Sequence, residues 1–62
     1  MTEYQNLPND PAMLLSFVNT QLRDNYPSFS EFVAAFHADD DAITEKLKMI
    51  DYEYDETQNQ FV

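Results

Sequence analysis

Two acidic segments contain the residues of this chain whose types and spacing could bind a metal ion. Asp39, Asp40 and Asp41 are consecutive, and carboxylate oxygens are the ligands that a hard cation such as calcium prefers. A second pattern, near the C-terminus, resembles the calcium-binding loop of an EF-hand. Glu56 and Val62 interrupt it, because they stand where an EF-hand loop needs glycine and a bidentate glutamate. The polar positions of this pattern alternate at spacings of two: Asp51, Glu53, Asp55, Thr57 and Asn59. We interpret the alternation as a strand with one solvated face, and we expect neither a metal site nor a cofactor.

Catalytic chemistry has little support in the residue types. His37 is the only histidine, and a general base needs a positioned partner that its acidic neighbours do not define. The chain has no cysteine and no glycine, which excludes a thiolate nucleophile, a disulfide and a glycine-rich phosphate loop. We therefore predict that the protein is not an enzyme and that His37 is a turn residue.

The charge balance bears on which partners the surface can attract. The chain has 62 residues, twelve carboxylates against three cations, and a net charge of -9. We expect a single domain that repels nucleic acid and anionic membranes and that either attracts a basic protein or is merely kept soluble. We expect neither a signal peptide nor a membrane span, and a cytoplasmic location in a bacterial-type cell.

Three helices between residues 10 and 51 must position these side chains, after an extended or loose segment over residues 1–9. Asp10 suits the N-cap position and Pro11 the first helical turn, and the first helix should end near Asn25. Its apolar face repeats at helical spacing. Met13 and Phe17 broaden that face, which is built from Leu14, Leu15, Val18 and Leu22.

The second and third helices have equally clear local signals. Ser28 and Glu31 form a capping box, and the second helix carries an aromatic stripe before ending near Phe36 or His37. Asp39 caps a third helix, which should stop by Asp51. The stripes consist of Phe29, Phe32, Val33 and Phe36 in the second helix, and Ile43, Leu47 and Ile50, with Met49 beside them, in the third.

The last eleven residues, 52–62, have the pattern of a hairpin. Tyr52 and Tyr54 alternate with acids, and residues 59–62 should return as a second strand that carries Phe61. Since glycine is absent, we expect a loose loop over residues 56–58 rather than a two-residue turn. The predicted fold is thus mainly α: a three-helix bundle with a short C-terminal β-hairpin.

The second and third helices also resemble a helix-turn-helix, and the hairpin that follows them makes the predicted fold winged-helix-like. His37 stands where such turns use glycine, and histidine tolerates the left-handed backbone better than most residues. In a DNA-binding unit the exposed side of the third helix enters the major groove. Here that side presents Asp40, Asp41, Thr44, Glu45 and Lys48. Direct nucleic acid binding is therefore not expected, because phosphate neutralisation needs cations.

The chain also resembles a family of short bacterial proteins described only as a domain of unknown function. The motifs that carry the resemblance are Leu7-Pro8-Asn9-Asp10-Pro11, Met13 to Ser16, Val18-Asn19, Leu22-Arg23-Asp24, Tyr52-x-Tyr54-Asp55 and Asn59-Gln60-Phe61. They cover nearly the whole chain. The resemblance implies a stand-alone bacterial protein without an assigned activity. It also implies glycine or another small turn residue at the positions of His37 and Asp51.

Two interpretations of the polar motif residues remain open. In the structural one, Arg23 clamps the C-terminal segment or the Asp10 loop, and Asn59 holds the hairpin turn. In the functional interpretation, polar motif residues contribute to an interaction surface that consists of Asn9, Asn19, Arg23, Asp40, Asp41, Thr44, Glu45 and Gln60. Our first hypothesis is a non-catalytic interaction or regulatory module for a basic protein. The alternative is a degenerate helix-turn-helix or a phosphate mimic within a complex, and self-association is open in both cases.

Overall fold

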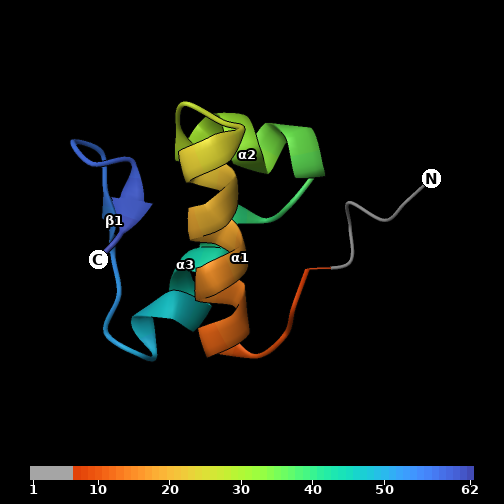
Figure 1. Ribbon diagram of the computed structural model, residues 1–62. Helices are drawn as coiled ribbons and strands as arrows, with labels where there is room; N and C mark the ends of the chain where they lie inside the picture. Colours follow the sequence, from red (N-terminus) through yellow and green to blue (C-terminus); the bar gives the residue numbers. More distant parts are fainter. Residues whose placement is uncertain (1–6) are drawn as a thin grey trace.

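The computed structural model describes residues 7–62, and the interpretation of residues 1–6 as extended or loose lies outside this range. Three helices are followed by a two-stranded antiparallel sheet, as predicted. Figure 1 shows α2 crossing one end of α1, with the hairpin along one side of the helices. The elements are α1 (Pro11–Asp24), α2 (Phe29–Phe36), α3 (Asp40–Lys48), β1 (Tyr54–Asp55) and β2 (Gln60–Phe61).

Each helix begins at the side-chain cap that the sequence predicts. Asp10 accepts a hydrogen bond from the amide of Met13, Ser28 from that of Glu31, and Asp39 from those of Asp41 and Ala42. These caps satisfy amides that have no partner inside a helix, and each is worth about 1 kcal/mol.

A left-handed residue closes the end of α2 and the turn that follows α3, although the chain has no glycine. His37 and Asp51 have φ of 53° and 66°. The next amide after each bonds back five residues: Ala38 N–H to the Val33 carbonyl at 3.0 Å, and Tyr52 N–H to the Leu47 carbonyl at 2.9 Å. This is the Schellman motif, in which a left-handed residue closes the helix. The two positions that were expected to need a small turn residue are both left-handed.

The core combines one side of each helix with the second strand. Its buried members are Leu14, Val18, Leu22, Phe32, Ile43, Leu47 and Phe61. Helix α1 contacts α2, α3 and β2, so it is the element against which the others pack. The apolar faces of the helices were predicted correctly except at two edges, because Met13 and Met49 are 63% and 74% exposed.

Both strands of the hairpin are shorter than predicted, because β2 contains only Gln60 and Phe61. Tyr52 is not part of β1, because its amide completes the end of α3. The paired residues are Tyr54 with Phe61 and Asp55 with Gln60. A loop over residues 56–59 joins the strands, and Asn59 is left-handed with φ of 53°. The expectation of a loop longer than two residues is confirmed.

Candidate interaction surfaces

The outer side of α3 is the most acidic part of the candidate surface. Ile43 and Leu47 turn inward and are buried, and the five residues predicted on the other side are exposed: Asp40, Asp41, Thr44, Glu45 and Lys48. The structure therefore brings the four candidate residues Asp40, Asp41, Thr44 and Glu45 together on one helix face, the acidic face of α3, which also carries Lys48.

The three consecutive aspartates at the start of α3 already serve the helix. One oxygen from each of Asp39, Asp40 and Asp41 lies within 4.8 Å of the others, and all three residues are exposed. Oδ1 of Asp39 accepts from the amides of Asp41 at 3.0 Å and Ala42 at 3.3 Å. Carboxylates in this position also complement the positive end of the helix dipole. Helix capping accounts for the cluster.

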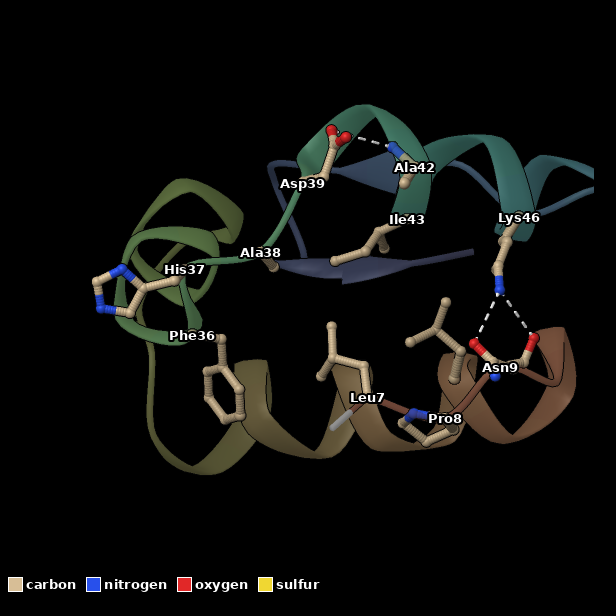
Figure 2. Close-up of a pocket in the computed structure, with 11 residues that line it drawn as sticks. Leu7, Pro8, Asn9, Phe36, His37, Ala38, Asp39, Ala42, Ile43 and Lys46 are labelled. Carbon is tan, nitrogen blue, oxygen red and sulfur yellow. Dashed lines mark hydrogen bonds between the residues drawn. The ribbon is translucent and has the colours of Figure 1, made fainter. Parts of the chain in front are cut away.

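A groove of about 430 Å³ separates the segment before α1 from α3. Figure 2 shows Leu7 and Pro8 on one wall and Ile43 across from them. At one end Nζ of Lys46 donates to the carbonyl oxygen of Asn9 at 3.1 Å and to its Oδ1 at 3.4 Å. Asn9 thus ties the first described residues to α3. Local sequence patterns missed this contact, since the partners are 37 positions apart.

A second hollow, of about 460 Å³, holds three further candidate residues. Asn19, Arg23 and Gln60 line it together, whereas Asn9 lies at the groove beside α3. Arg23 does not clamp the C-terminal segment or the Asp10 loop. Its Nε and Nη2 donate to the carboxylate of its neighbour Asp24 at 2.9 and 3.0 Å. This bond raises the pKa of Arg23 and lowers that of Asp24.

Asn19 has a structural role at the floor of this hollow. Its Oδ1 accepts from the Phe61 amide at 2.8 Å, and its Nδ2 donates to the Phe61 carbonyl at 3.1 Å. The side-chain amide therefore bonds to β2 as the backbone of a neighbouring strand would. Its hydrogen-bonding groups are already engaged within the fold.

Asn59 anchors the other end of the hairpin. Its Nδ2 donates to the carbonyls of Leu22 and Tyr26, both at 3.0 Å, at the end of α1. Its Oδ1 accepts from the Tyr54 hydroxyl at 2.7 Å, and that hydroxyl accepts from the Phe29 amide at 3.2 Å. The chain of bonds joins the end of α1 to the start of α2. Asn59 was expected to hold the hairpin turn, whereas its side-chain amide anchors the hairpin to the helices.

The carboxylate of Asp55 holds the loop of the hairpin through two hydrogen bonds. Nε2 of Gln58 donates a hydrogen bond to this carboxylate at 3.0 Å, and the Thr57 amide donates another at 2.9 Å. These two bonds lower the pKa of Asp55. With Asp55 and Asn59 engaged inside the hairpin, the residues of the EF-hand-like pattern form a short sheet and its loop. Among residues 7–62, no helix combines the length and the apolar character that a membrane span requires.

Comparison with known proteins identifies a family and no activity. A family model described as "Domain of unknown function (DUF4250)" matches residues 8–61. No curated protein and no solved structure matches the chain. The match extends from the segment before α1 to β2, so the hairpin and its two asparagine anchors lie within the region that the family model covers.

Proposed function

The chain belongs to the DUF4250 family, and we propose that it is a non-catalytic interaction or regulatory module that binds a basic partner protein through the acidic face of α3. The observation that carries this proposal is the exposure of Asp40, Asp41 and Glu45 on one side of a helix whose other side is buried. A surface of one charge sign steers an oppositely charged partner and sets the salt dependence of the complex.

The positions of the cations support the same proposal. Arg23 is paired with Asp24, and Lys46 is bonded to Asn9. Lys48 is exposed on the same side of α3 as Asp40, Asp41 and Glu45, and it offsets one of their three charges. Phosphate binding needs a set of cations on one surface, so direct nucleic acid binding is not part of the proposal. The proposal includes a cytoplasmic location in a bacterium and the absence of an enzymatic activity.

Affinity capture with charge-matched variants tests the proposal. The double variant Asp40→Asn/Glu45→Gln removes two charges from the acidic face of α3. Asp24→Asn/Glu31→Gln removes two exposed charges elsewhere. We expect the wild type and the second variant to retain the same basic protein at low ionic strength, and the first variant to lose it.

The salt dependence completes this test. Raising the ionic strength should release the retained protein, because exposed charges separated by more than about 10 Å are screened at 0.1 M. Equal retention by both variants, or a complex that resists high salt, would show that the acidic face of α3 is not the binding surface. Thermal unfolding of both variants checks that neither result reflects a loss of fold.

A further inference from the structure

The two edges of the hairpin differ in how their backbone groups are satisfied. Glu53 and Val62 exchange two backbone hydrogen bonds, of 2.9 and 2.8 Å. Bonded and non-bonded pairs alternate in an antiparallel ladder, so the next pair, Tyr54 and Phe61, directs its peptide groups outward. On the β2 side the Asn19 side chain is hydrogen-bonded to both the amide and the carbonyl of Phe61.

Among residues 7–62, the β1 side has no counterpart of Asn19. The side chain of Tyr54 turns inward, and its ring centroid lies 5.4 Å from those of both Phe29 and Phe61. Its hydroxyl donates a hydrogen bond to Asn59. Within the part of the chain that the structure describes, no residue bonds to the outward peptide groups of Tyr54. Such an edge can pair with a further strand.

Carboxylates surround this open edge. A shallow hollow of about 710 Å³ lies beside β1, and Lys48 is the only cation that lines it. Its acidic residues are Asp51, Glu53, Asp55 and Glu56. Because side chains alternate along a strand, Glu53 and Asp55 project to the face opposite the inward ring of Tyr54. The open edge therefore carries two acids at a spacing of two residues on its outer face.

We propose that the outer edge of β1 binds an extended basic segment of a partner protein as a third strand. A residue of that segment pairs with the peptide groups of Tyr54, and lysine or arginine side chains on either side of it face Glu53 and Asp55. Directly opposite side chains in a sheet are about 5 Å apart, so opposite charges attract and like charges repel. A second copy of the same edge would repel because it brings the same carboxylates.

This surface is distinct from the acidic face of α3, and the two proposals can fail separately. The probe is a six-residue peptide of alternating lysine and valine with blocked ends, titrated into the isotopically labelled protein and followed by NMR. We expect the largest shift changes at residues 53–55. We also expect hydrogen exchange of the Tyr54 amide to slow by about tenfold or more, since a hydrogen-bonded amide exchanges only when the pairing opens.

Two controls separate strand pairing from charge attraction. The same peptide with N-methylated valines keeps every charge but cannot donate to the Tyr54 carbonyl, and it should bind at least about tenfold more weakly. The variant Glu53→Gln/Glu56→Gln should weaken the unmodified peptide, whereas Asp40→Asn/Glu45→Gln should not. Equal binding of the methylated peptide, or shift changes centred on α3, would overturn the proposal.

Discussion

The two strands of the hairpin have the same length, two residues each, but opposite relations to the rest of the molecule. The edge of β2 is closed by the Asn19 side chain from α1, while the edge of β1 offers the peptide groups of Tyr54 and is bordered by carboxylates. A two-stranded hairpin is marginal by itself in water. The difference shows that the hairpin depends on side-chain amides, which fix one edge and leave the other accessible.

The largest expected effect comes from removing the anchor of the hairpin. Asn59→Ala loses three partly buried hydrogen bonds and places alanine at a left-handed position, so the free energy of unfolding should fall by about 3 kcal/mol. Asn59→Gly keeps the backbone preference and isolates the side-chain bonds. Urea denaturation followed by circular dichroism measures both, and a loss for Asn59→Ala below about 1 kcal/mol would contradict the anchor.

Opening the closed edge should have the next largest effect. Asn19→Ala leaves both peptide groups of Phe61 without their side-chain partner, and we expect a loss of about 2 kcal/mol. Asn9→Ala is the matched control, because it removes an exposed amide bonded to Lys46 and should cost less than about 0.5 kcal/mol. Similar losses for the two variants would show that Asn19 does not close the edge.

The turn before β1 offers a stabilising change that leaves the backbone groups of both edges unaltered. Asp51 is exposed with φ of 66°, and glycine adopts that backbone without a steric penalty. Asp51→Gly should raise the free energy of unfolding by about 1 kcal/mol. Asp51→Asn removes the same charge and separates electrostatics from backbone strain. A destabilised glycine variant would rule out strain at this turn.

The smallest expected effect is a pH dependence of the free energy of unfolding, which arises in the loop that joins the two strands. The bonds from Gln58 and Thr57 lower the pKa of Asp55 below its unfolded value, which is about 4. The carboxylate form therefore stabilises the fold above that pH, and the contribution is lost as the pH falls through the lowered pKa. Asp55→Asn should flatten the stability profile below about pH 5. Glu56→Gln is the control, and identical profiles for the two variants would contradict this assignment.

Local signals in the sequence were sufficient for the helices and for most of the core. Asp10, Ser28 and Asp39 cap helices because each acts within three residues of itself. The left-handed position of His37 also follows from a local need to end a helix. These features could be predicted because their partners are neighbours in the chain.

The roles of the polar candidate residues could not be predicted in the same way. Asn19 and Asn59 bond to groups 42 and 37 positions away, and no local pattern specifies such partners. Arg23 was expected to reach a distant segment and bonds to its neighbour instead. An asparagine beside an apolar helix face has the same appearance in sequence whether it binds a partner or holds a strand. Only the packing of the hairpin on α1 distinguishes the two.

Amide hydrogen exchange at Phe61 and Tyr54 tests most directly whether one edge is closed and the other open. The Phe61 amide is bonded to Asn19 and should exchange only when the hairpin or the whole fold opens. The Tyr54 amide should exchange at least about a hundredfold faster, near the rate of an unfolded chain. Equal protection of the two amides would contradict the account, because it would mean that the β1 edge is already paired or that Asn19 does not hold β2.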